Sequence, residues 1–249
     1  MVTRSSRLAL LALTVLAAGV CSALGVWQAR RLASRRAANR IAVAGRELPP
    51  VDLGNLTGPG SLDQRRALAT GTFDHDHAIV LRARSERDVP GVHIVTPLRL
   101  DGRMEAVLVN RGFVPANDAM RPDSALVDRT GHLTVHGLAF RIPESPDSGT
   151  PLIREGLTTW RRLDLPTLRA RLPYPILDIY LYETGPEPRA KGAPLFPRPT
   201  PIPEPDDGPH LYYMVQWFGL AAASLAFGVL FVWRGTGRRI EEQGVRSEE

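Results

Sequence analysis

The sequence predicts a membrane protein in which two transmembrane helices flank an extracytoplasmic β-rich α+β domain. Residues 8–27 and 211–233 are uncharged apolar runs of 20 and 23 residues, and a helix of roughly 20 apolar residues spans the core of a bilayer. Between the two runs, short β-branched segments separated by Gly, Asp and Pro indicate strands. Only 43% of the 249 residues are hydrophobic, which excludes a transporter with many spans.

The first apolar run has a second interpretation as a signal peptide, because Arg4 and Arg7 precede it. It is longer than the apolar region of a signal peptide, which has about 7–15 residues, and no small-x-small cleavage motif precedes Gln28. We therefore expect an uncleaved anchor. The short leader before this run leaves no room for a mitochondrial transit peptide, which points to a bacterial inner membrane.

The chain divides into six segments by composition. Residues 28–45 are rich in Ala and Arg and lack proline, so they are expected to continue the first helix beyond the membrane until Gly45 ends it. The many prolines after Gly185 favour an extended, stiff connector. The expected segments are transmembrane helix 8–27, helical extension and loop 28–61, β-rich domain 62–185, Pro-rich connector 186–209, transmembrane helix 211–233 and cytoplasmic tail 234–249.

Within the domain, alternating and β-branched patterns predict six or seven short strands and one short helix. DGR at 101–103 lies between two of these runs at hairpin distance. The expected strands lie within 66–73, 77–83, 91–100, 105–114, 132–142, 157–164 and 175–183, with the helix at 165–172.

The net charge of +5 comes mainly from arginines beside the two apolar runs. Lipid headgroups account for them without nucleic acid. The charges do not orient the spans clearly, since arginines follow both runs. We place the long loop outside and both termini in the cytoplasm. Cys21 is the only cysteine, which excludes an intramolecular disulfide.

The soluble segments contain no common catalytic motif, and no enzyme activity is expected. The one cluster that resembles a catalytic centre is DHDH at 74–77. On a strand, His75 and His77 would share a face, as metal ligands do. The alternative is a polar turn between two strands, and we expect no metal.

The second apolar run begins with a histidine and aromatic residues. At helical spacing from His210, one face collects Tyr213, Met214 and Trp217 and then the small residues Ala221, Ser224 and Gly228. The first run has a similar face of Thr14, Ala18, Ser22 and Gly25. Small residues allow close helix packing, so the two helices are expected to pair. A neutral His210 at their outer mouth could bind haem iron or only cap its helix.

Four segments of the sequence resemble the Surfeit locus protein 1 family of cytochrome c oxidase assembly factors. They are LGVWQARRL at 24–32, GVHIVTPLRL with VLVNRGFVP at 91–100 and 107–115, TTWRRLDLPTLRARL at 158–172, and HLYYMVQWFGLA at 210–221. Their order and the two-span topology also agree with the family. Phe113 stands where the family usually has Trp, and Met214 replaces a small residue.

The resemblance implies a non-enzymatic protein that acts on subunit I of the oxidase together with other assembly factors. It implies transient haem a binding with His210 as ligand and with Tyr213 and Trp217 packed on the ring. It also places the domain outside the cytoplasm. Further motif residues are candidates for partner contacts: Gly25, Trp27, Gln28, Arg31, Asn110, Arg111 and Gly112.

Two alternatives remain open at this stage. The motifs could form a membrane-anchored interaction scaffold that binds no haem, or DHDH could serve a metal-dependent enzyme. Asn110, Arg111 and Gly112 have a purely structural interpretation, as a strand end that bends. Gly25, Trp27 and Gln28 have one as interfacial anchors of the first helix.

Overall fold

The computed structural model describes residues 4–56, 61–122, 131–144, 151–154, 157–184 and 196–246. The chain divides into two compact units. We call the first, Met1–Arg40 with Pro205–Glu249, the helical unit, and the second, Ile41–Glu204, the β-domain. The first part of the expected proline-rich connector, residues 186–195, lies outside the described residues.

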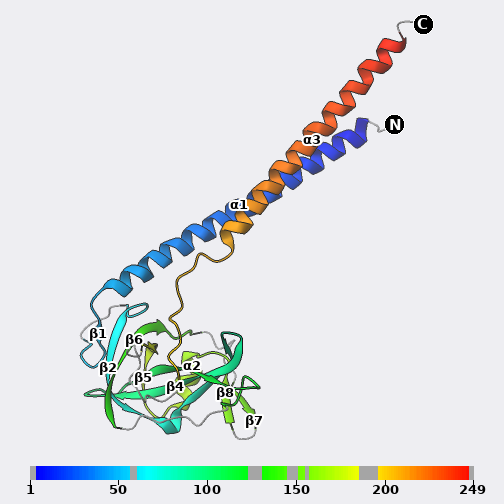
Figure 1. Cartoon of the computed structure of the whole chain (residues 1–249). Helices are drawn as coiled ribbons and strands as arrows, with labels where there is room; N and C mark the ends of the chain where they lie inside the picture. The colour runs from blue at the N-terminus through cyan, green and yellow to red at the C-terminus, as the bar shows by residue number, and fades with distance from the viewer. Residues whose placement is uncertain are drawn as a thin grey trace. The chain divides into compact units, whose positions relative to one another are not determined.

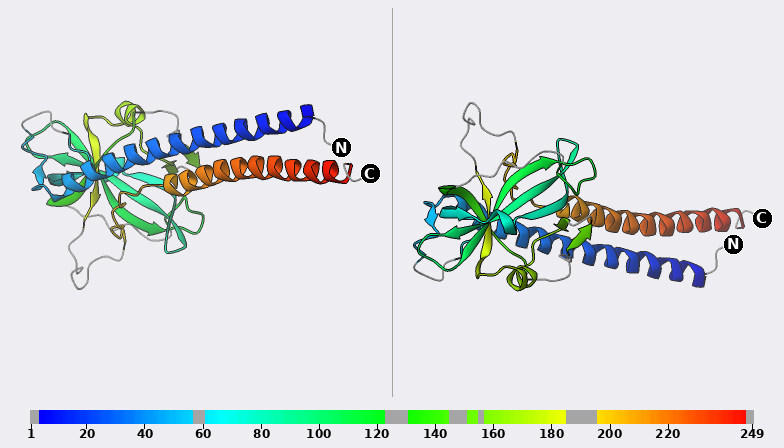
Figure 2. Two further views of the ribbon diagram at one scale, coloured as in Figure 1. Left: turned by 90° about the horizontal axis from the view of Figure 1, so that it is seen from above. Right: turned by 90° about the horizontal axis from the view of Figure 1, so that it is seen from below.

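The helical unit is formed by α1 (Arg4–Glu47) and α3 (His210–Arg246), which lie side by side (Figures 1 and 2). Both are long and apolar enough to cross a membrane. Their apolar side chains point mostly outward, with Leu8 61% and Val229 68% exposed, unlike the core helix of a soluble protein. The first helix continues beyond its apolar run as expected, but Gly45 does not end it, because α1 continues through Gly45 to Glu47. The second helix is longer than expected, because α3 continues through most of the predicted tail to Arg246.

Small residues bring α1 and α3 together, as their spacing predicts. A Cβ atom added to Gly25 would lie 2.8 Å from Cε1 of Phe218. At the other end of the contact, a Cβ on Gly228 would lie 2.9 Å from Oγ1 of Thr14. Residues at heptad-like spacing face the partner helix, which is the pattern of two helices packed with a small crossing angle. The buried or partly buried residues at this spacing include Thr14, Ala18, Cys21, Gly25, Gln28 and Leu32 of α1 and His210, Met214, Trp217, Ala221, Ser224, Gly228 and Phe231 of α3.

The β-domain contains one nine-stranded sheet. The seven strands and the helix expected from the sequence are present, and β2 and β6 begin at the predicted residues. The sequence did not indicate the two shortest strands, β1 and β7. The elements are β1 (Val51–Asp52), β2 (Arg66–Phe73), η1 (His75–His77), β3 (Ile79–Glu86), β4 (Val89–Leu100), β5 (Ala106–Pro115), β6 (His132–Arg141), β7 (Leu152–Arg154), β8 (Leu157–Trp160), α2 (Leu165–Arg171) and β9 (Ile176–Glu183).

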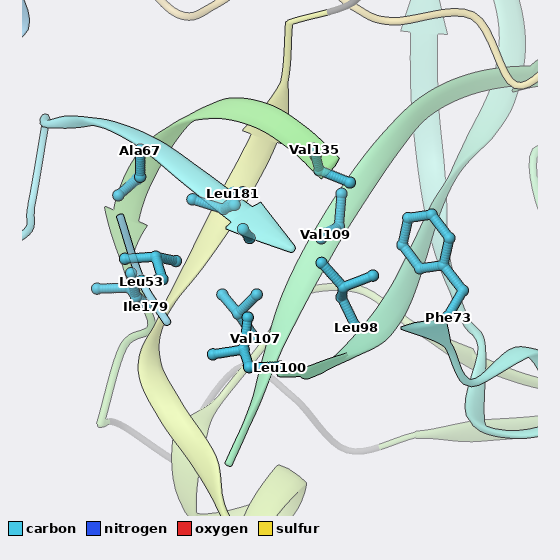
Figure 3. Close-up of a cluster of buried hydrophobic side chains, with 12 residues drawn as sticks. Leu53, Ala67, Phe73, Leu98, Leu100, Val107, Val109, Val135, Ile179 and Leu181 are labelled. Atoms are coloured by element: carbon cyan, nitrogen blue, oxygen red, sulfur yellow. The ribbon is translucent and has the colours of Figure 1, made fainter. Parts of the chain in front are cut away.

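Part of the sheet closes into a barrel. The strand order is β1-β2-β6-β9-β5-β4-β3-β8-β7, and β2 also pairs with β4, so β2, β6, β9, β5 and β4 form a ring. Gly71 of β2 makes the closure feasible, because a Cβ there would lie 1.9 Å from the carbonyl oxygen of Arg99 in β4. Apolar side chains from all five strands, including Phe73, Leu98, Val109 and Leu181, fill the interior (Figure 3).

A second core lies outside the barrel, where β3 and β8 extend the sheet and α2 covers it. Trp160, Leu165 and Leu168 pack there against Leu81 and Leu108. The Asp164 side chain caps α2 by accepting a hydrogen bond from the Thr167 N–H (2.9 Å). Trp160 and Asp164 of the TTWRRLDLPTLRARL segment therefore have structural roles, one in the core and one at a helix N-terminus.

The described part of the proline-rich connector is not a free spacer. Arg198 forms an antiparallel bridge with Phe113 of β5, with N–O distances of 2.8 and 2.9 Å. Phe196 packs against the cluster around Val92 and Ile94, and an Arg198–Glu86 ion pair (3.0 Å) adds a side-chain contact. We call residues 196–200 the strap. The expectation of a stiff connector is corrected for this segment, because it pairs with the sheet and belongs to the β-domain.

Candidate functional site

The site predicted at the start of α3 is a contact between two helices. His210, the first residue of α3, places its Nδ1 2.9 Å from Oε1 of Gln28 in α1. An amide oxygen can only accept a hydrogen bond, so Nδ1 carries the proton and donates it. In the neutral imidazole, the other ring nitrogen, Nε2, has the lone pair that a metal ion requires.

The turn before His210 leaves space beside this nitrogen. Gly208 has a φ of +64°, and its N–H donates to Oδ1 of Asp206 (2.9 Å). A Cβ on Gly208 would lie 3.6 Å from Cδ2 and 3.7 Å from Nε2 of His210. Glycine therefore fits the left-handed backbone and keeps a side chain away from the free nitrogen. No sequence pattern singles out Gly208.

Polar contacts hold the same turn against the outer part of α1. Asn39 donates to the carbonyl oxygen of Asp206 (2.8 Å), and Arg36 donates to Oδ2 of Asp207 (2.8 Å). Arg35 also donates to the Asp206 carbonyl oxygen (3.3 Å). The arginines that follow the first apolar run are expected to meet lipid headgroups, but Arg35 and Arg36 bind the acidic turn before α3. The clustering of acidic residues before α3 opposite basic residues after the first span was the available signal.

Of the other predicted residues of the helical unit, some lie at the contact between α1 and α3 and others are exposed at its surface. Gly25 is buried against α3, and Trp217 is partly buried on the α3 face that also carries His210. Tyr213 is 42% exposed, and its ring lies beside that of Tyr212 (5.7 Å). Trp27 is 53% exposed, with the Arg31 guanidinium 6.0 Å from its ring centre. Trp27 and Arg31 are therefore available at the surface of this unit.

The VNRGFVP residues lie inside the β-domain. Asn110 and Arg111 are 2% and 3% exposed. The register between β4 and β5 shifts between Ile94 and Val95, which leaves Arg111 as the extra residue of a β-bulge. Its guanidinium lies 5.3 Å from the ring centre of Phe73. This placement favours the structural interpretation of the motif, with the bend occurring within β5 instead of at its end.

Asn110 connects the bulge to a buried histidine. Its Oδ1 accepts a hydrogen bond from the Gly112 N–H (3.1 Å), and its Nδ2 lies 3.2 Å from Nδ1 of His93. Because an amide nitrogen can only donate, His93 Nδ1 accepts and the imidazole is neutral. Burial, together with the nearby charge of Arg84, lowers the pKa of His93 to about 4.

This buried histidine predicts acid sensitivity of the β-domain. In the unfolded state His93 has its ordinary pKa of 6.5 and becomes protonated below that pH. In the folded state it becomes protonated only near pH 4. The His93 contribution to stability is therefore complete above pH 6.5 and lost as the pH falls towards 4, by roughly 3 kcal/mol. Urea unfolding of the full chain in detergent should show this slope, and His93→Gln should remove it. Identical slopes in both proteins would contradict the assignment.

The DHDH segment does not form the strand on which the metal hypothesis depends. His75–His77 is a short 3-10 helix, η1, with Asp74 at its N-cap. The Asp74 carboxylate bonds to Nδ1 of His77 (2.8 Å) and to the hydroxyl of Tyr174 (2.7 Å). Burial alone would raise the pKa of Asp74, but these hydrogen bonds hold it below its ordinary value. Within the described residues, no group of three acidic, histidine or cysteine side chains could hold a metal ion.

The β-domain also has a cavity of about 270 Å³ between the last turn of α1 and the outer face of β2 and β6. Arg46, Arg66 and His136 contribute to its lining. Arg46 donates to Oε1 of Gln64 (2.7 Å) and to the carbonyl oxygen of Pro203 (2.9 Å). Its guanidinium thus joins the end of α1 to the segment that follows the strap, which is a structural role.

The protein is thus a β-barrel protein with two candidate membrane anchors. The barrel domain lies in the sequence between two paired apolar helices, and a histidine lies at the contact of these helices. The chain belongs to the SURF1 family, whose model matches residues 15–222. It is also similar to a SURF1-like protein of Monosiga brevicollis, with 30% identity over 229 residues that cover 86% of this chain and 84% of the relative. The resemblance stated from the motifs is confirmed. The family is one of cytochrome oxidase assembly factors.

Proposed function

We propose that this protein assists the insertion of haem a into subunit I of a cytochrome c oxidase, with His210 as a transient ligand of the haem iron. Membership of an assembly-factor family supports the oxidase as target. The observation that carries the haem proposal is the geometry of His210, whose Nδ1 is bonded to Gln28 while Gly208 leaves the side of Nε2 without a Cβ.

The residues around His210 fit a haem. A neutral imidazole nitrogen is a common axial ligand of haem iron. Met214 and Trp217 lie on the same face of α3, one and two turns further along, and provide apolar and aromatic surface for a porphyrin. Tyr213, which is 42% exposed, would contact such a ring beside them. Haem a, when bound, supplies the iron that subunit I requires.

An interfacial ligand suits a protein that delivers its cofactor. The His210 side chain is only partly buried, and its turn is bonded mainly through exposed groups of α1 and the segment 206–208. A deep cage would slow haem release, whereas a single ligand at the edge of a helix pair permits transfer. Trp27 and Arg31, exposed beside this edge, are the residues that we propose to contact the oxidase or another assembly factor.

We further propose that α1 and α3 cross a bacterial inner membrane, with the β-domain outside and both ends of the chain in the cytoplasm. The exposed apolar side chains of both helices support insertion. α1 begins and α3 ends at the same end of the pair (Figure 2), as two spans require. The proline-rich residues before α3 join the β-domain to the second span.

The test is the visible spectrum of the full chain purified in detergent from cells that synthesise haem a. The wild type should show a Soret band, and His210→Ala should lose it, because the variant lacks the imidazole that we propose to bind the iron. The matched control is His136→Ala, since His136 is an exposed histidine of β6, and it should retain the band. A colourless wild type that still co-purifies with subunit I would contradict haem binding and favour an interaction scaffold.

A further inference from the structure

We propose that Gln28 is a positioning residue for His210. Its amide oxygen accepts a hydrogen bond from Nδ1 and so keeps the proton there, which leaves Nε2 free to bind the haem iron. This inference rests on the proposed function, which assigns His210 to haem iron. It adds a residue from the other helix to the site. It also gives the glutamine of LGVWQARRL a role that is distinct from anchoring α1 at the membrane surface.

The position of Gln28 supports this role. It is 8% exposed and lies on the α1 face that contacts α3, between Gly25 and Leu32. A buried amide in a largely apolar contact needs a hydrogen-bond partner, and His210 Nδ1 at 2.9 Å provides one. This hydrogen bond therefore satisfies the amide oxygen of Gln28 and the Nδ1–H of His210. The pairing also places the partly buried ring of His210 against α1 instead of in open solvent.

A neutral imidazole exists as two tautomers, and only one of them fits a metal ligand at Nε2. In water the proton exchanges between the two ring nitrogens. The hydrogen bond from the Nδ1–H to Oε1 of Gln28 stabilises the tautomer with a lone pair on Nε2. Metal-binding histidines generally donate their second N–H to an acceptor in this way, and loss of that acceptor typically lowers metal affinity by about 10–100-fold.

The backbone of the turn is already fixed by other residues, which isolates the contribution of Gln28. Asn39 and Arg36 bind the main chain of Asp206 and the side chain of Asp207, and the Gly208 N–H is bonded to Asp206. The start of α3 is therefore held without Gln28. What Gln28 adds is control over the orientation of the ring and the location of its proton.

The experiment uses the full chain in detergent and compares wild type, Gln28→Leu and Gln28→Glu. The first readout is the ¹⁵N NMR spectrum of the His210 ring without haem, which reports the protonated nitrogen. The wild type should be protonated at Nδ1, and Gln28→Leu should shift towards the Nε2 form or a mixture. The second readout is titration with ferric haem a. Gln28→Leu should bind roughly 10–100-fold more weakly.

Gln28→Glu separates positioning from packing, because a carboxylate of similar size accepts the same hydrogen bond more strongly. It should retain wild-type affinity and lower the reduction potential of bound haem a, since a stronger acceptor makes the imidazole more electron-donating. A purely structural role of Gln28 would instead make Leu and Glu equally harmful. That outcome, or an unchanged ring spectrum in Gln28→Leu, would overturn the inference. If the ring spectra behave as expected but the wild type binds no haem, the proposed function fails while the positioning of His210 by Gln28 stands.

Discussion

Replacing Gly112 with alanine is expected to destabilise the β-domain by roughly 3 kcal/mol, because two effects combine there. Gly112 has a φ of +113°, which L side chains rarely adopt. A Cβ at this position would also lie 1.9 Å from the carbonyl oxygen of Arg198. That oxygen cannot move easily, since it accepts a hydrogen bond from the Phe113 N–H (2.8 Å). The alanine variant must therefore release the strap or distort β5.

The control is Gly102→Ala in the turn between β4 and β5. Gly102 also has a positive φ, +67°, but a Cβ there meets nothing within 4 Å. It should cost only the backbone strain, about 1 kcal/mol. Thermal unfolding of the full chain in detergent, followed by circular dichroism, measures both variants. Limited proteolysis of Gly112→Ala should in addition cleave near the strap. Equal losses in the two variants would show that the contact with Arg198 contributes nothing.

The Gly112 contact shows why the interpretation of VNRGFVP remained open at the sequence level. Glycine after Asn-Arg predicts a bend, and β5 does contain a bulge at Arg111. The reason that only glycine fits at position 112, however, is the close approach of the strap, a segment more than 80 residues later in the chain. That segment is rich in proline, so its composition predicts an extended spacer and gives no sign that one residue pairs with β5.

Most strands of the β-domain could be predicted because each has a local pattern. β2, for example, alternates buried and more exposed residues over its length, and this period is visible in the sequence. β1 and β7 have only two and three residues, too few for a period. Barrel closure is also invisible, because local patterns identify strands but not their partners, and the pairing of β2 with β4 depends on a backbone approach at Gly71.

The candidate site was predicted in part for the same reason. Helical spacing placed His210 and Trp217 on one face of α3, and the structure turns that face towards α1. The spacing could not show that Gln28 would contact His210, because the two residues are 182 positions apart. Nothing in either segment specifies how far one helix is shifted along the axis of the other. Gly208 was missed because a single glycine in a polar turn has many ordinary explanations.

Replacing Gly25 with leucine is expected to open the outer end of the helix pair and weaken haem a binding by roughly tenfold or more, as loss of the Gln28 contact would. A Cβ at Gly25 would lie 2.8 Å from the Phe218 ring, so a leucine needs space that the contact does not have. Gln28 is one helical turn further along α1. Separation at Gly25 therefore draws Gln28 away from His210. Gly25→Ala should have a smaller effect, because Phe218 is 40% exposed and its ring can shift.

The matched control is Gly19→Leu. Gly19 lies in the same helix, but a Cβ there meets nothing within 4 Å, and a leucine would face outward, where apolar side chains are already common. Titration of both variants with haem a measures the effect at the site, and the ¹⁵N spectrum of His210 reports the tautomer independently of haem. Equal affinities for the two variants would show that the site does not need this helix contact.

A crosslink distinguishes local opening from dissociation of the two helices. The Cβ of Thr14 lies 3.5 Å from a Cβ built on Gly228, within the range of a disulfide. Thr14→Cys with Gly228→Cys, in a Cys21→Ser background, should therefore crosslink under mild oxidation. We expect the crosslink to persist in Gly25→Leu, because the deeper contact between α1 and α3 has its own small residues and a rigid helix can tilt about it. Weak haem binding with an intact crosslink would locate the effect at the His210–Gln28 contact. Loss of both would mean that Gly25 holds the whole pair together, so that the histidine depends on the entire packed face.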